Sequence, residues 1–171
     1  MSLVIVGIGN PVLTDDAVGI KIARELEKVQ FKSGEIIVKE AYAGGLRLMD
    51  ALVGFDQAII IDSIITGKNK AGTIHRSNLN DLIITRNLSS SHDLDLISAL
   101  ELARISGLKC PQEILIWAIE AEDVCTFSEQ LTPCVQKAVS QVISEILQIT
   151  GNLAGIAENL ELVSNKRGQK S

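Results

Sequence analysis

Aromatic side chains are scarce in this sequence. Of its 171 residues only 3% are Phe, Trp or Tyr, whereas 46% are hydrophobic and 22% are charged. A hydrophobic core must therefore be built from Ile, Leu, Val and Ala, which is typical of a parallel sheet covered by helices. The length suits one domain with a single substantial core and is too short for two ordinary domains.

An excess of basic residues is also lacking. The net charge is -5, and the lysines and arginines are scattered rather than clustered, so we expect no nucleic-acid partner. No apolar run is long enough to cross a bilayer, and no basic segment with a cleavage site precedes the first apolar run. We therefore expect a cytoplasmic protein without membrane insertion.

Cysteine is limited to Cys110, Cys125 and Cys134. An odd number without Cys-x-x-Cys spacing indicates neither a disulfide framework nor a thiolate zinc site. We expect all three to be reduced and packed in or near the core. Cys134 lies near a predicted helix start, where a thiol can be activated, but no histidine is near it in the sequence, so we do not expect a nucleophile.

Strand and helix patterns alternate along the chain. Apolar runs predict strands over residues 3–6, 35–40, 58–61 and 113–119, with a short edge strand over 72–76. Helical spacing predicts helices over residues 17–28, 46–52 and 92–105, and a last helix that opens at Thr132-Pro133. We expect a single domain over residues 1–150 and a polar, mobile tail over residues 151–171.

Strands that alternate with single helices favour an α/β three-layer sandwich. We predict an open, mainly parallel, five-stranded twisted sheet of order 2-1-3-5-4, with the fourth strand as an antiparallel edge and helices on both faces. Ligands of such sheets bind beyond the carboxyl ends of the strands, where the chain reverses its winding direction between strands one and three. Asp15, Asp16 and Asp62 follow those two strand ends.

A glycine turn separates the first strand from the first helix. Gly7-x-Gly9 invites a dinucleotide-binding interpretation, but position 12 is Val, and the acids that follow would repel a pyrophosphate. We expect no nucleotide cofactor. The glycines instead allow the backbone to turn sharply and to approach a substrate closely.

The three acids have structural alternatives as well as a cation-binding role. Asp15 can cap the first helix, and Asp16 can lie in its first turn, where the helix dipole favours negative charge. Asp62 follows four apolar residues of a buried strand, so its carboxylate must be hydrogen-bonded, protonated or paired with a cation, unless it is a turn residue.

Two histidines complete the set of candidate ligands. His92 follows three serines at a predicted helix start, where a positive helix end favours a neutral imidazole with a lone pair available for a metal. A surface role for His92 is the structural alternative. His75, on the predicted edge strand, is expected to face solvent.

These residues together resemble the nickel-iron hydrogenase maturation endopeptidases. The likeness covers the stretch from Gly7 to Glu27, Gly44-Gly45 and Leu131-Thr132-Pro133, and so spans the chain to about residue 149. The resemblance implies that Asp16, Asp62 and His92 bind metal and that Asp16 and Asp62 take part in catalysis. It also implies a substrate-binding role for residues Gly9, Asn10, Gly44 and Gly45. Position 16 is Asp here, whereas some relatives carry the longer Glu.

The resemblance further implies an endopeptidase that removes a C-terminal peptide from the nickel-loaded precursor of a hydrogenase large subunit. The nickel would belong to the substrate, and the protease would be a monomer when free. Water would attack the peptide bond, activated either by the metal or by a carboxylate, and Asp15 is a spare carboxylate for that role. The alternatives are a binding module of the same fold that cuts no bond and a nucleotide-dependent enzyme.

Overall fold

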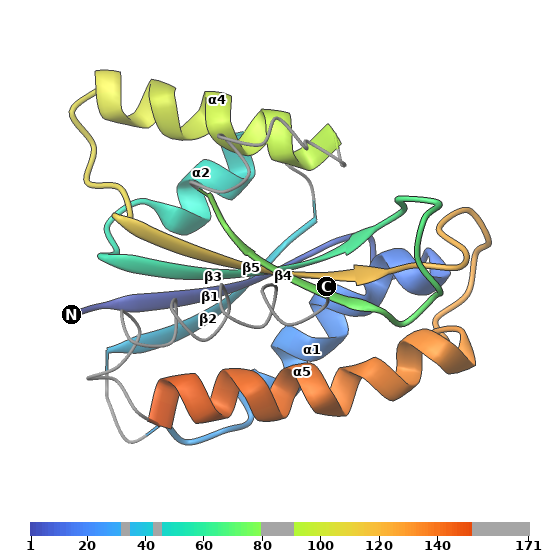
Figure 1. The fold of residues 1–171 in the computed structure, drawn as a ribbon. Coiled ribbons are helices and arrows are strands. Elements are labelled where there is room, and N and C mark those ends of the chain that lie inside the picture. The colour runs from blue at the N-terminus through green and yellow to red at the C-terminus, as the bar shows by residue number, and fades with distance from the viewer. Residues whose placement is uncertain (32–34, 43–45, 80–90, 152–171) are drawn as a thin grey trace, which may run out of the picture.

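The computed structural model describes residues 1–31, 35–42, 46–79 and 91–151, and it describes residues 46 and 91–95 by their backbone alone. Within these residues, five strands form one open sheet (Figure 1). They are β1 (Leu3–Ile8), β2 (Ile36–Ala41), β3 (Gln57–Ile64), β4 (Ile74–Asn78) and β5 (Glu113–Glu120). The order is β2-β1-β3-β5-β4, and β4 runs antiparallel to β5. The predicted order and the antiparallel edge are confirmed.

Helices cover both faces of the sheet. The helical segments of the described chain are η1 (Thr14–Ala17), a single 3-10 turn, followed by α1 (Val18–Glu27), α2 (Leu46–Leu52), α4 (Ser91–Ile105) and α5 (Pro133–Gly151). Figure 1 shows α1 and α5 on one face and α2 and α4 on the other, which confirms the three-layer arrangement. None of these helices is both long and apolar enough to span a membrane.

The two faces of β3 divide the aliphatic core between the two helix layers. Successive strand residues point to opposite faces. Ile59 and Ile61 accordingly pack in the cluster that includes α1 and α5, whereas Ala58 and Ile60 pack with α2 and α4. The same alternation continues past Ile61, so the next two residues, Asp62 and Ser63, point to opposite faces of the sheet.

Close backbone contact holds α1 against the sheet. A Cβ atom on Gly7 would lie 2.1 Å from the carbonyl oxygen of Gly19, and a Cβ atom on Gly19 would lie 2.3 Å from the carbonyl oxygen of Ile61. No side chain fits between backbones at this separation. The start of α1 is therefore held beside Ile8 at the end of β1 and beside Ile61 of β3.

Two of the differences from the predicted boundaries affect the candidate site. β3 is longer than the predicted residues 58–61 and continues to Ile64, because β5 pairs with it over that length, with Asp62 opposite Ala118. Asp15 and Asp16 lie in η1, a tight turn before the first α-helix, which begins at Val18. The domain limits of 1–150 stay a prediction, and residues 152–171 of the predicted tail lie outside the described residues.

Candidate functional site

The candidate site lies at the carboxyl ends of β1 and β3. β1 pairs with β3 only as far as Gly7 opposite Ile61, so β3 continues alone on that side. Asp62 is the first β3 residue beyond this pairing, and β1 leads through the turn at Gly9 and Asn10 into η1 with Asp16. As predicted, β1 and β3 are neighbours. The two segments that carry the acids therefore lie at the same end of the sheet, beyond the carboxyl ends of these strands.

Asp16 is held by two hydrogen bonds. Its Oδ2 accepts the backbone N–H of Asn10 at 2.8 Å, and its Oδ1 accepts the hydroxyl of Ser63 at 3.1 Å. The side chain is half-buried. Among the ion pairs of the described residues none involves Asp16. Each carboxylate oxygen has a second lone pair, so Asp16 can accept a cation without losing either hydrogen bond.

Asp62 and Asp16 each accept a hydrogen bond from Ser63. Asp62 is only 6% exposed, and its Oδ1 accepts the backbone N–H of Ser63 at 2.8 Å. Because β3 residues alternate, Asp62 points to the side of α2 and α4, and Ser63 points to the side of α1. The acidic side chains thus approach the edge from opposite faces of the sheet, and Ser63 contacts both residues.

The predicted third ligand is placed only by its backbone. His92 is the second residue of α4, which covers the face toward which Asp62 points, and its side chain lies outside the described residues. Gly44 and Gly45 lie outside them too, so their substrate role stays a prediction. Among the described residues no group of three or more His, Cys, Asp or Glu side chains could hold a metal.

Gly9 and Asn10 form the turn that carries the chain from β1 to η1. Gly9 has φ of +142°, and a Cβ there would lie 1.8 Å from the carbonyl oxygen of Asp16. The predicted sharp turn is confirmed, and this glycine is required by the chain's own backbone. Contact of Gly9 and Asn10 with a substrate stays a prediction.

Asp15 does not cap the first helix, so that prediction is wrong. Its carboxylate is fully buried and accepts the backbone N–H groups of Glu122, Asp123 and Thr132 at 2.9, 3.1 and 2.8 Å, as well as the hydroxyl of Thr132. These donors belong to the segment between β5 and α5. Asp15 therefore fixes that segment beside η1, and burial on this scale leaves no access for a reacting water.

Glu120, at the end of β5, was missed by sequence reasoning. It is 2% exposed and accepts the N–H of Thr66 at 2.7 Å, the hydroxyl of Thr66 at 2.9 Å and the N–H of Gly67 at 3.3 Å. Burial works against the charged form, but hydrogen bonds from Thr66 and His75 prevail and keep the pKa of Glu120 below its ordinary value. An acid after a buried apolar strand was the available signal, as it was for Asp62.

His75 was predicted to face solvent, but the structure differs. Its side chain is only 31% exposed, and its Nε2 lies 3.0 Å from Oε2 of Glu120. Because a carboxylate accepts, Nε2 donates in this contact. The edge strand β4 and the segment that follows β3 are thereby joined to the end of β5 at one buried carboxylate.

The three cysteines form no disulfide, as predicted, but only one of them is partly buried. Cys110 is half-buried, whereas Cys125 and Cys134 are exposed. The expectation that all three pack in or near the core is wrong for those two, because both lie in the segment that leads from β5 into the start of α5.

Large apolar side chains are exposed on the segments that surround the acids. Val12 is 43% exposed after β1, Ile65 is 53% exposed after β3, and Phe127 is 82% exposed after β5. The segments of Val12 and Phe127 are paired, since Ser128 N–H donates to the carbonyl oxygen of Val12 at 3.0 Å. These exposed apolar side chains next to a polar site are candidate contacts for another protein.

Comparison with known proteins gives consistent matches. A family model described as hydrogenase maturation protease matches residues 20–149. The hydrogenase 2 maturation protease of Escherichia coli strain K12 is 27% identical over 149 residues, which cover 86% of this chain and 89% of that protein. The matched stretch of the family model contains Asp62 and His92 and begins after Asp16.

Solved structures show the same likeness. The hydrogenase maturating endopeptidase HybD from E. coli is 26% identical, with a TM-score of 0.74 over 86% of this chain and 91% of that one. The [NiFe] hydrogenase maturation protease HybD from Thermococcus kodakarensis has a TM-score of 0.68 over 88% of this chain and 99% of that one. Its identity of 23% supports the fold alone.

Proposed function

The chain belongs to the hydrogenase maturation protease family, and from that membership we infer that it is an endopeptidase that processes a hydrogenase large subunit. The observation that supports this activity best is that Asp16 and Asp62 both accept hydrogen bonds from Ser63 at the carboxyl ends of β1 and β3. The cut removes a C-terminal peptide from the precursor of a nickel-iron enzyme.

Nickel acts in this proposal as part of the substrate. Asp16, Asp62 and His92 bind the nickel that the precursor already carries, and the protein needs no nucleotide and no metal of its own. Two carboxylates and one imidazole leave coordination positions for ligands from the partner. The requirement for nickel would make cleavage wait until the metal centre has been loaded.

Cleavage then follows the general scheme of peptide hydrolysis. The oxygen of a water bonds to the carbonyl carbon of the scissile peptide, a carboxylate of Asp16 or Asp62 takes the proton, and the C–N bond breaks as the proton passes to the leaving amine. Asp15 is unsuited to this proton transfer, since it is fully buried and accepts hydrogen bonds from backbone and hydroxyl donors.

The precursor docks on the exposed segments around the acids in this proposal. Val12, Ile65 and Phe127 provide apolar contacts, and Glu120 holds the segment that contains Ile65 through Thr66. We expect the free protein to be a monomer that acts in the cytoplasm, where its precursor is made.

The test is the intact mass of a nickel-loaded large-subunit precursor after incubation with the protein, beside nickel-free precursor. Wild type is expected to remove a C-terminal peptide only from the nickel-loaded form. Asp62→Asn keeps the size of the side chain but loses its negative charge, and is expected to lower the cleavage rate at least ~100-fold.

Asp50→Asn is the matched control, because Asp50 is an exposed aspartate of α2. It should cleave at the wild-type rate. An unchanged mass for a nickel-loaded precursor that demonstrably binds the wild-type protein would contradict the endopeptidase proposal and favour a binding module. Equal cleavage of nickel-free precursor would contradict the role of nickel.

A further inference from the structure

Ser63 is the residue through which the two acids are connected. Its hydroxyl donates to Oδ1 of Asp16 at 3.1 Å, and its backbone N–H donates to Oδ1 of Asp62 at 2.8 Å. The residue is 9% exposed. One residue of β3 therefore contacts both carboxylates, although Asp16 and Ser63 are 47 positions apart in the chain.

A serine is not what the strand alone would favour at this position. Ile59 and Ile61 occupy the two preceding positions on the same face of β3, and both are in the core. β-Branched apolar residues suit strands better than serine. A buried hydroxyl also has to find a hydrogen-bond partner, and the one found here is a side chain of the candidate site.

The hydroxyl determines how the Asp16 carboxylate is oriented. The last torsion of an aspartate is broad and roughly two-fold, so it does not by itself define the plane of the two oxygens. Asn10 N–H contacts one oxygen and Ser63 Oγ the other, at 2.8 and 3.1 Å. With both oxygens engaged from the protein side, the remaining lone pairs have a defined direction.

We propose that Ser63 is a positioning residue that orients Asp16 for the nickel of the precursor. This inference rests on the proposed function and names a residue that acts on the cation through Asp16. A hydrogen bond from outside the coordination sphere holds a metal ligand in place, and loss of such a contact typically lowers metal affinity ~10–100-fold.

The pairing suits an aspartate at position 16. The side chain of Asp is one methylene shorter than that of Glu, and with this length Oδ1 stays within hydrogen-bond distance of the Ser63 hydroxyl. A glutamate would have one more methylene between the backbone and the carboxylate, so the same contact with the hydroxyl would require a different side-chain conformation. Ser63 and Asp16 should therefore act as a coupled pair.

The first test measures cation binding by the isolated full-length protein, using calorimetric titration with Ni²⁺ and, separately, Cd²⁺. Ser63→Ala is expected to weaken binding at least ~10-fold, since it removes only the hydroxyl. Ser63→Thr keeps a hydroxyl at a strand position and should stay within ~3-fold of wild type. Ser77→Ala, in β4, is the matched control and should bind as wild type does.

A purely structural role of Ser63 would give different cation affinities. The proposal would be overturned if Ser63→Ala bound the cations as tightly as wild type, or if Ser63→Thr lost as much cation affinity as Ser63→Ala. Thermal unfolding of each variant shows whether the fold is kept. If wild type binds neither cation at millimolar concentration, the proposal also fails, while nickel-gated cleavage of the precursor by the same sample would leave the proposed function standing.

The second test is a double-mutant cycle with Asp16→Glu. If Ser63 acts through the short carboxylate, Ser63→Ala should cost less than ~2-fold in cation affinity in the Asp16→Glu background, against at least ~10-fold in wild type. An equal loss in both backgrounds would overturn the coupling and assign the effect of Ser63 to another contact.

Discussion

Two neighbouring residues of the same chemistry have opposite roles in this molecule. Asp15 and Asp16 are adjacent aspartates of one 3-10 turn. Asp15 is fully buried and is surrounded by donors from the segment before α5, whereas Asp16 is half-buried and bonded to Asn10 and Ser63. A tight turn points neighbouring side chains in different directions, so one aspartate serves the fold and the other faces the candidate site.

Asp15→Asn is expected to reduce the free energy of unfolding by about 2–3 kcal/mol. The new amide group would point a donor at backbone N–H groups of Glu122, Asp123 or Thr132, which would lose their acceptor. For a domain of this size that corresponds to a decrease in Tm of roughly 5–10 °C. Thermal unfolding monitored by circular dichroism measures it, with Asp50→Asn as the exposed control. A Tm within ~1 °C of wild type would show that the buried contacts contribute little.

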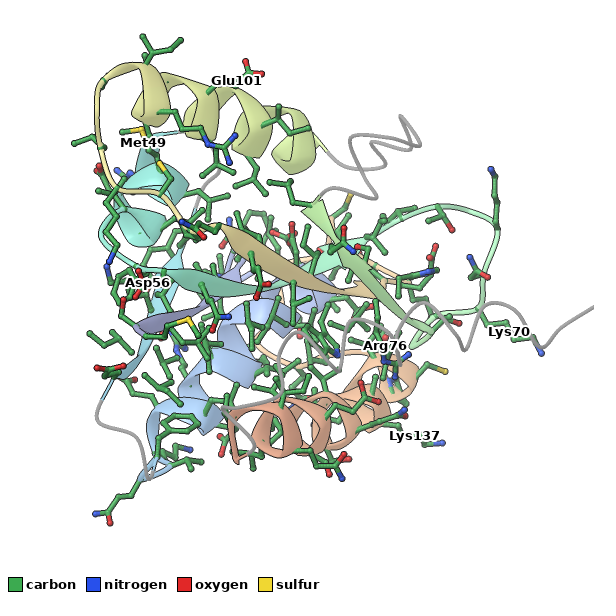
Figure 2. The ribbon with its side chains drawn as sticks, turned by 60° about the vertical axis from the view of Figure 1, so that its left-hand side comes forward. Met49, Asp56, Lys70, Arg76, Glu101 and Lys137 are labelled. Carbon is green, nitrogen blue, oxygen red and sulfur yellow. The ribbon has the colours of Figure 1, made fainter. Side chains whose placement is uncertain are left out.

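Helix α5 is attached to the edge of the sheet by polar contacts as well as by its apolar face. Arg76, labelled in Figure 2 beside α5, forms an ion pair with Glu145. The indole N–H of Trp117 also donates to Glu145, at 3.0 Å. One carboxylate of α5 is thus held by side chains of β4 and β5.

Glu145 should make the stability of this attachment depend on pH. Burial opposes the charged form, but the hydrogen bonds from Arg76 and Trp117 prevail and lower its pKa from an ordinary 4.5 to about 2. Because the folded pKa lies below the unfolded one, the stabilisation is complete above pH ~4.5 and is lost as the pH falls toward 2.

Glu145→Gln is accordingly expected to cost ~1–2 kcal/mol of unfolding free energy near pH 7 and almost nothing near pH 2, after allowance for the partial exposure of the pair. Urea unfolding at several pH values measures the difference. Glu25→Gln breaks an exposed pair with Lys28 and is the control, with little expected effect on the unfolding free energy near pH 7. The same loss for Glu145→Gln at both pH values would contradict the assignment.

At the scale of the whole molecule, two groups of exposed apolar residues can be compared. Val12, Ile65 and Phe127 lie on segments that follow the carboxyl ends of strands. Ile105, 85% exposed, ends α4 at the other end of the sheet, as the course of α4 in Figure 1 shows. Within this pair of groups, Phe127 and Ile105 have similar exposed fractions, 82% and 85%, so Ile105 is a suitable comparison for Phe127.

Phe127→Ser is expected to raise the KM for nickel-loaded precursor roughly tenfold and to leave kcat nearly unchanged. Aromatic residues often contribute strongly to protein interfaces, and loss of binding that is equal in ground and transition states affects KM alone. Ile105→Ser, at the other end, should have wild-type kinetics. Equal effects of both variants would show that Phe127 contacts no precursor.

Much of this architecture follows from local patterns. The continuous apolar run from Ala58 to Ile61 requires cover on both faces and so indicates a central strand, which leaves the short segment around Arg76 for the edge. Asp62 was found because charge after a buried strand is costly unless it is paired or hydrogen-bonded, and Asp16 because it is one of two adjacent acids at a predicted helix start. The roles of His92, Gly44 and Gly45 stay predictions.

Hydrophobic periodicity and motif spacing are properties of contiguous residues, so they predicted the layers and indicated the family. The preference for right-handed crossovers then limited the possible strand orders. Which side chains contact each other followed from the packing of the folded chain. Asp15 contacts Thr132 across 117 positions, and Ser63 contacts Asp16 across 47. Such polar contacts depend on the pairing of strands and the direction of individual side chains, and they leave no periodic pattern in the chain that could have predicted them.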